Sequence, residues 1–435
     1  MAYFQLESDN PNFSFLIRKN PASGMLVKRL RQGTVFGFYS KNNPSQYNCW
    51  FKDHNSSSSY DPGAVFEYND TTRYSAALFI NHCCDEFFRD TCLKALPEDT
   101  TDFRNALLIN CIRAKSKYIE IFSRSFREFQ WDITPLTVGY YRIKLSTGEP
   151  LRRLLCFACV FSLINAIQNG ECDQYDEGLL VKYAKMIQYL DAPYFVRYVF
   201  KVNLIRSEST FAKLLPHLNN ETIKLQYGHN FLQRMRFVEQ HLDGETLIDV
   251  GCGEGKYLRY AKKVQQYFAI ERDEVRREII QRKCLRDGRE NVTILESLDE
   301  LPDMEGRKTF FLTEVVEHND YDDAIALLKR CLLPDSRVIV TTPNRDFNVH
   351  YFGDEELESD MDAWQYAMQE SSEPPSRRES HKRHEDHHFE LTQEEFHQFI
   401  ATATDGLSCR VTFYTVGDKV SGVSPQSGAV IDVGG

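Results

Sequence analysis

The sequence has no long uninterrupted apolar run and no export signal at its start. The residues from Met1 to Glu7 lack both the basic stretch and the apolar stretch of a secretory leader, and no apolar run is long enough to cross a bilayer. We therefore expect a cytoplasmic protein that makes no membrane contact. With 435 residues, of which 42% are hydrophobic, the chain can form two or three domains.

A disulfide pattern is also missing. The twelve cysteines are scattered along a chain that is too long to need such cross-links, so we interpret them as reduced thiols. Cys156 and Cys159 have the spacing of half a zinc site, but they lie inside an apolar run and no second pair follows at zinc spacing. We interpret this pair as packing within a buried helix.

The chain has no excess of basic charge, because its net charge is −11. This excludes a protein that coats nucleic acid non-specifically, which needs many phosphate contacts. It does not exclude an enzyme that holds one nucleic-acid end with a few local cations. Basic clusters occur at residues 18–19, 28–31, 276–283 and 377–383, and charge alone does not distinguish a binding surface from a solvated face.

The first half of the chain predicts an α+β domain. Short alternating runs, such as Gly33–Tyr39 and Val65–Tyr68, are typical of an antiparallel sheet, and apolar residues then recur at helical spacing over Glu149–Asn169 and Glu177–Leu190. A helical connector with a capping signal at Leu218–Glu221 and a helix at Phe231–His241 follows. We assign residues 1–206 to a docking domain, 207–242 to the connector and 243–435 to an α/β domain.

The α/β assignment rests on alternating strands and helices, which predict a doubly wound parallel sheet. Residues 354–385, rich in acidic residues, serine and proline, are expected to be an insertion. The predicted strands are Thr246–Val250, Gln266–Glu271, Val292–Glu296, Thr309–Thr313, Arg337–Thr342 and Arg410–Val416.

A glycine-rich turn follows the first of these strands. Asp249 is followed by Gly251, Gly253 and Gly255, and Glu271 ends the next strand about twenty residues later, where a carboxylate suits a ribose diol. The spacing departs from the dinucleotide pattern G-x-G-x-x-G, and Asp249 would repel phosphate. An acidic turn fits a cationic ligand without phosphate, such as S-adenosylmethionine, and this stretch resembles motif I of class I methyltransferases.

A second group of residues predicts a metal site. Glu314, Glu317 and His318 have i, i+3 and i+4 spacing, which would place them on one helical face after an apolar strand. The alternative is a helix start with acidic residues at its positive end. The histidine-rich stretch at residues 383–390 favours a metal, because carboxylates with imidazoles suit Mn²⁺, Mg²⁺ or Co²⁺, with Mn²⁺ preferred.

Together these motifs resemble the RNA 3′-terminal ribose 2′-O-methyltransferase family, of the small-RNA type. The motif Glu-x-x-Glu-His is present at residues 314–318, an Asp-His-x-Phe-Glu element at 386–390, and a Thr-Thr-Pro-Asn turn at 341–344, followed by Asn348. Gln233-Arg234 and Pro425-Gln426 also follow the family pattern. Segments Phe13–Lys19, Arg73–Ala77 and Tyr189–Asp191 resemble the extra domain of the bacterial RNA-repair branch.

The resemblance implies a class I methyltransferase domain, S-adenosylmethionine as cofactor, an RNA 3′ end as substrate, and a polynucleotide kinase, phosphatase and ligase protein as partner. Two alternatives remain: a non-catalytic activator of a repair ligase, and a methyltransferase with another acceptor. His318 is the implied catalytic residue, with solvent as the other proton acceptor. The implied binding residues are Asp249, Gly251, Gly253, Gly255, Glu271 and Ser297 for the cofactor, Glu314, Glu317, His318 and His387 for the metal, and Arg234, Asn344 and Asn348 for RNA.

Overall fold

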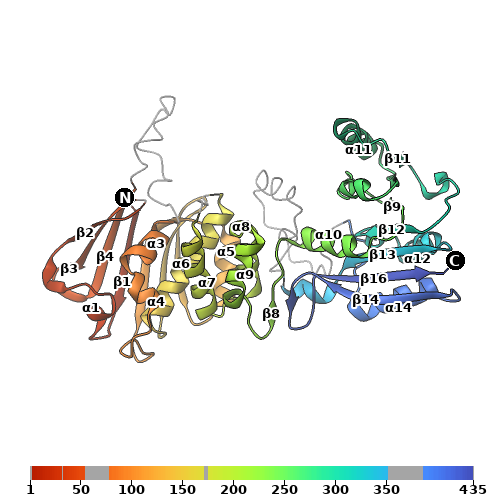
Figure 1. The fold of residues 1–435 in the computed structure, drawn as a ribbon. Helices are drawn as coiled ribbons and strands as arrows, with labels where there is room; N and C mark the ends of the chain where they lie inside the picture. The colour runs from red at the N-terminus through yellow and green to blue at the C-terminus, as the bar shows by residue number, and fades with distance from the viewer. Residues whose placement is uncertain (1, 32, 54–77, 171–174, 351–385, 435) are drawn as a thin grey trace. The chain divides into compact units, whose positions relative to one another are not determined.

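The computed structural model describes residues 2–31, 33–53, 78–170, 175–350 and 386–434 (Figure 1). These residues form two compact units, Met1–Asn220 and Glu221–Gly435. The division falls inside the expected connector, so α9 (Glu208–Leu218) belongs to the first unit and α10 (Asn230–His241) to the second. The expected strand at 65–68, the segment 73–77 and the expected insertion at 354–385 lie outside the described residues.

The N-terminal unit is built on a seven-stranded antiparallel sheet in the order β2-β3-β4-β1-β5-β7-β6. Buried residues alternate with half-buried ones along β1, because one face of the sheet is covered by helices. This confirms the predicted α+β class. The strands are β1 (Ala2–Ser8), β2 (Leu26–Arg29), β3 (Gly33–Ser40), β4 (Asn43–Asp53), β5 (Asn105–Arg113), β6 (Gln130–Thr137) and β7 (Tyr140–Thr147).

The helix α6 (Leu151–Gln168) is the centre of this unit's helical layer. It is buried almost all round, and both Cys156 and Cys159 are fully buried in it, as predicted. Within the described ranges it is the one helix long and apolar enough to cross a membrane, and most of it is covered by the unit itself. The other helices are α1 (Phe13–Leu16), α3 (Leu78–His82), α4 (Arg89–Leu93), α5 (Ser116–Ser125), α7 (Glu177–Tyr189) and α8 (Tyr194–Leu204).

The C-terminal unit contains a second seven-stranded sheet, in the order β11-β10-β9-β12-β13-β16-β14. Its first five strands pair in parallel, whereas β16 (Gln426–Val433) is antiparallel to both of its neighbours. The predicted strands are confirmed within a residue or two, but β16 was not predicted. They are β9 (Thr246–Val250), β10 (Gln266–Ile270), β11 (Val292–Leu295), β12 (Lys308–Thr313), β13 (Ser336–Pro343) and β14 (Cys409–Val416).

The remaining elements of this unit cover the sheet and connect its strands. The predicted capping signal at 218–221 is wrong, because α9 ends there and His229 caps α10. The short strands β8 (Ile223–Lys224) and β15 (Lys419–Val420) pair with each other. The longer helices after α10 are α11 (Glu274–Asp287), α12 (Tyr321–Cys331) and α14 (Gln393–Thr404).

The strand order leaves room for a ligand at one edge of this sheet. The chain leaves β9 toward β10 on one side and leaves the neighbouring strand β12 toward β13 on the other, and such a switch point opens a crevice at the carboxyl ends of parallel strands. The residues that follow β9, β10 and β12 are Gly251, Glu271 and Glu314. The fold therefore brings the glycine-rich turn and the Glu-x-x-Glu-His segment to the same edge.

Candidate active site

The glycine-rich turn needs its glycines for backbone conformation. Gly251, Gly253 and Gly255 all have positive φ values, between +55° and +75°. A Cβ on Gly251 would lie 3.0 Å from a methyl group of Val315, and one on Gly255 would lie 2.5 Å from Leu258. At Gly253 the same position is open space. The turn therefore has no room for a side chain at Gly251 or Gly255, whereas Gly253 faces open space.

Two buried carboxylates lie beneath the turn. Glu271 accepts hydrogen bonds from the backbone N–H groups of Gly253 (2.8 Å) and Asp273 (3.0 Å), so it holds the turn against β10. Asp249 is buried and accepts a hydrogen bond from the Tyr267 hydroxyl at 2.6 Å. Burial raises the pKa of Asp249 to about 7, and the charge of Glu271 adds to this rise. The turn therefore rests on negative charge, which suits a cationic ligand.

Ser297 lies at the same edge, directly after β11. Its hydroxyl caps a 3₁₀ turn, Leu298–Glu300, by accepting the Asp299 N–H at 3.3 Å. It is half-buried.

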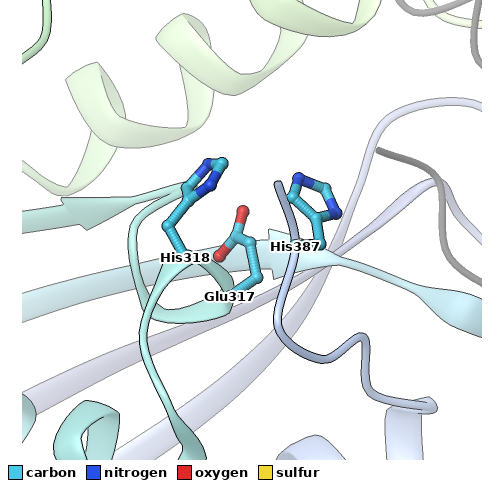
Figure 2. Close-up of side chains that lie close together, drawn as sticks. All are labelled: Glu317, His318 and His387. Carbon is cyan, nitrogen blue, oxygen red and sulfur yellow. The ribbon is translucent and has the colours of Figure 1, made fainter. Parts of the chain in front are cut away.

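The Glu-x-x-Glu-His segment does not form the predicted α-helical face. Glu314 follows β12 with a φ of +56°, and only Val316–His318 is helical, as a single 3₁₀ turn. This turn still brings Glu317 and His318 together with His387, which comes from the segment before α14 (Figure 2). One ligand atom from each of the three residues lies within 4.8 Å of the others.

The donor set fits a divalent metal. Glu317 is fully buried, and its Oε1 has no hydrogen-bond partner among the described residues, whereas Oε2 accepts from the Thr342 hydroxyl at 3.2 Å. A buried carboxylate oxygen without a partner is costly unless a ligand satisfies it. Burial lowers the pKa of His318, which favours the neutral imidazole that a metal requires. One carboxylate oxygen and two imidazoles then form a mixed oxygen and nitrogen set that suits divalent transition metals, Mn²⁺ among them.

His387 is held in place by a carboxylate that the sequence analysis missed. Its Nδ1 lies 2.7 Å from Oε1 of Glu390, and the side-chain amide of Asn348 donates to Oε2 of Glu390 at 2.6 Å. Both His387 and Glu390 are buried. A carboxylate that fixes Nδ1 directs Nε2 outward, as is typical of histidine ligands. The i, i+3 spacing of the two residues was the available signal.

Glu314 lies outside this group of three and faces Arg234 instead. The carboxylate Oε2 of Glu314 is 2.9 Å from Nη1 of Arg234, and Oε1 accepts from the Thr341 hydroxyl at 3.1 Å. The side-chain amide of Gln426 also donates to Glu314, at 3.4 Å. Burial, together with the nearby Glu314 charge, raises the pKa of Glu317. Glu314 thus lies beside Glu317, His318 and His387, which we call the metal group, but it is not one of its members in this structure.

The other residues expected to contact RNA have structural partners. The Asn344 amide donates to the Ser424 carbonyl at 3.1 Å, and its Oδ1 accepts the Asp346 N–H at 3.1 Å. Asn348 supports Glu390, as described above. His388 is half exposed and lies 2.8 Å from Asp320. His384, the first histidine of the histidine-rich stretch at residues 383–390, lies outside the described residues.

Comparison with known families covers most of the chain. The family described as the Hen1 N-terminal domain matches residues 3–223, and a family described as a methyltransferase domain matches residues 226–394. No curated protein matches the chain.

Two solved structures match the chain over its whole length. A chain in a structure of the Pnkp1/Rnl/Hen1 RNA repair complex is 25% identical, with a TM-score of 0.78, and the match covers 99% of this chain and 100% of that one. A second structure of a Pnkp1/Rnl/Hen1 complex is 24% identical, with a TM-score of 0.75 and the same coverage. With its N-terminal half matched by the Hen1 N-terminal domain and a methyltransferase domain following it, this chain belongs to the Hen1 family.

Proposed function

We propose that this chain transfers a methyl group from S-adenosylmethionine to the 2′-oxygen of the terminal ribose of an RNA 3′ end, with the help of a divalent metal, Mn²⁺ or Mg²⁺. One observation carries this proposal. The Oε1 of buried Glu317, which has no hydrogen-bond partner in the described part of the chain, lies with His318 and His387 at the sheet edge that also carries the glycine-rich turn. This supports adjoining sites for a cation and a cofactor, as proposed.

The proposed metal ligands are Glu317, His318 and His387, joined by Glu314 if its carboxylate leaves Arg234. A divalent cation in this place would lower the pKa of a ribose hydroxyl and bind both vicinal hydroxyls, which supports terminal specificity. An internal ribose cannot present the diol, because its 3′-oxygen is esterified. A 3′-phosphate end is rejected for the same reason.

The chain's own residues would then align the two reactants. Asp249 and Glu271 supply negative charge beneath the turn, which favours a sulfonium ligand over a neutral one. In the transfer the sulfur–methyl bond breaks and the oxygen–methyl bond forms, while the 2′-hydroxyl proton leaves to His318 or to water. Arg234, Asn344 and Asn348 are proposed to position the terminal nucleotide, Arg234 directly and the two asparagines through the loops they hold.

We also propose a partner for the N-terminal unit. The similar full-length structures are of complexes that contain Pnkp1, Rnl and Hen1, and the match extends over both units of this chain. A kinase, phosphatase and ligase partner in RNA repair is therefore the proposed assembly.

The test is methyl transfer from labelled S-adenosylmethionine to matched short RNAs, one with a 2′,3′-diol end, one with a terminal 2′-deoxynucleotide and one with a 3′-phosphate. Labelling of the diol RNA alone, in Mn²⁺ but not in EDTA, is expected. Equal labelling of the three RNAs, or labelling that EDTA does not reduce, contradicts terminal 2′-O transfer with metal and favours a different acceptor.

A second role in activating a partner ligase is favoured by the Hen1 N-terminal domain match, which covers a unit without the metal group. A Glu317→Ala variant separates the two roles. It should lose methyl transfer yet stimulate ligation by the partner as the wild-type chain does. If the variant loses both, activation depends on the methyltransferase site and the roles are not separate.

A further inference from the structure

A cavity in the N-terminal unit has five basic side chains and one acidic side chain among its fifteen described lining residues. It has a volume of about 690 Å³ and is bordered by α4, α6, α7 and the residues after β2. The chain as a whole has a net charge of −11, so a cavity with an excess of positive side chains needs an explanation. Asp176 is the one acidic side chain among the described lining residues, and the five basic ones are Arg31, Arg89, Arg152, Lys182 and Lys185.

Internal ion pairs account for only two of these five cations. Arg31 pairs with Asp176, with 3.2 Å between Nη1 and Oδ2, and Lys182 pairs with the buried Asp85. Within the described part of the chain, Arg89, Arg152 and Lys185 have no carboxylate oxygen within 4.0 Å. Three of the five lining cations therefore have no direct ion pair within the described part of the chain.

Arg152 is fixed in position. Its guanidinium lies 4.0 Å from the centre of the Tyr189 ring, and its Nε donates to the Cys92 carbonyl at 3.1 Å. It is half-buried, whereas Arg89 and Lys185 are exposed. The Asp99 carboxylate, which accepts the backbone N–H of Arg152 at 2.9 Å, supplies a nearby negative charge, although it forms no direct ion pair with the guanidinium. The contacts with Tyr189 and Cys92 fix the guanidinium in the cavity lining, where it is a preorganised donor for an anion.

The shape and the side chains indicate what kind of anion fits. Guanidinium groups form paired hydrogen bonds with phosphate, and three of the five cations are arginines. Leu93 and Tyr189 also line the cavity and offer apolar surface for a base. Its volume lies within the range of roughly 300–1,000 Å³ that holds compact ligands. This favours one or two nucleotides over a folded protein segment.

We infer that this cavity binds the phosphoryl groups of a nucleotide or of an RNA strand, with Arg152 as a fixed contact and with Arg89 and Lys185 as cations at the rim. This site is separate from the methyltransferase residues and does not depend on the function proposed for them. A free nucleotide and an RNA strand present the same phosphate chemistry, so the experiment must distinguish the two sources.

The test measures binding to the full-length chain by a short single-stranded RNA with a 3′-phosphate, by ATP, by tripolyphosphate and by a glutamate-rich peptide. The variant Arg89→Glu/Lys185→Glu is compared with Lys41→Glu/Lys52→Glu, which makes the same charge change at exposed sites outside the cavity. Any RNA binding by the methyltransferase unit is common to both variants. Melting temperatures check that each variant is folded, and the milder Arg89→Gln/Lys185→Gln replaces the first if it is not.

We expect the cavity variant alone to bind phosphate probes at least about tenfold more weakly, with an RNA salt slope smaller by about 1.4, the value for two lost phosphate contacts. If RNA binds more tightly than ATP and tripolyphosphate, the ligand of the cavity is an RNA strand. If ATP and tripolyphosphate bind as tightly as RNA or more tightly, the ligand is a free nucleotide. The inference is overturned if the cavity variant and the control variant bind every probe equally well. It is also overturned if the cavity variant loses only the binding of the glutamate-rich peptide.

Discussion

Arg234 and Glu314 form an ion pair that links the glycine-rich turn to the edge of the metal group. The distance between Nη1 of Arg234 and Oε2 of Glu314 is 2.9 Å. On its other side the Nε of Arg234 donates to the Tyr257 hydroxyl at 3.1 Å, and Tyr257 follows the glycine-rich turn. Both side chains of the pair are largely buried, with 12% and 18% of their surface exposed. Arg234 therefore restrains a proposed metal ligand and the cofactor turn with the same planar group.

Removal of Arg234 should destabilise the C-terminal unit. In Arg234→Ala, the Glu314 carboxylate keeps little access to water and loses its counter-charge, which we expect to cost about 2 kcal/mol of unfolding free energy. Urea denaturation measures this. The control Arg282→Ala breaks an exposed pair with Glu278 on α11 and should cost less than about 0.5 kcal/mol. Equal losses in the two variants would mean that the Arg234 pair has no special role.

The second prediction concerns metal affinity. Glu390 orients His387 through Nδ1, so Glu390→Gln should weaken Mn²⁺ binding about 10- to 100-fold while leaving the three proposed ligands in place. Titration calorimetry of the full chain with Mn²⁺ measures the affinity. Glu394→Gln is the matched control, because Glu394 is a nearby exposed acid at the start of α14, and it should bind Mn²⁺ as the wild-type chain does. Unchanged affinity in Glu390→Gln would contradict the role given to this carboxylate.

The strands that lead to the site were predictable because their signals are local. Thr246–Val250 is a short apolar run that ends at a glycine turn, and the structure has a strand over those residues. By contrast, β16 contains Ser427, Gly428 and Ala429, which have weak strand propensity, and it is buried on both faces. It is stabilised by pairing with strands on either side, which a reading of local pattern does not include.

The site was predictable in its residue types but not in its pairings. Spacing alone placed Glu314, Glu317 and His318 on one helix, whereas Glu314 has a positive φ and lies outside the short helical turn of the other two. Its partner Arg234 lies eighty residues earlier in the chain, and no local pattern links them. His387 was found because histidines are dense in that stretch. The contact between the cofactor turn and Val315 depends on the tertiary fold and has no sequence signal.

The third prediction concerns pH and Asp249, whose folded pKa is raised to about 7 by burial. The folded state then holds a proton that the unfolded chain has released, so this group's contribution to stability falls as pH rises from about 4 to about 7 and is lowest above that. Asp249→Asn keeps an acceptor for the Tyr267 hydroxyl and removes the charge. Its stability relative to the wild-type chain should therefore increase from pH 5 to pH 8, as measured by urea denaturation without ligand.

The same substitution should have the opposite effect on the cofactor. If the negative charge of Asp249 favours a sulfonium ligand, Asp249→Asn should bind S-adenosylmethionine about tenfold more weakly at pH 8, a loss of about 1.4 kcal/mol. Calorimetric titration measures this loss. A variant that gains stability at high pH and binds the cofactor unchanged would leave Asp249 with a structural role alone.

The last prediction tests the contact between the cofactor turn and the segment that carries the metal group. Gly251→Ala and Gly253→Ala both place an alanine at positive φ, which costs on the order of 1 kcal/mol, but only the first also presses a methyl group against Val315. Gly251→Ala should thus lose more stability than Gly253→Ala and should also weaken Mn²⁺ binding, because Val315 lies between Glu314 and Glu317. Adding Val315→Ala removes the crowded methyl groups and should restore Mn²⁺ affinity in Gly251→Ala, whereas it should not change Mn²⁺ affinity in Gly253→Ala. If the added substitution affects both backgrounds equally, the two sites are adjacent but not mechanically coupled through this contact.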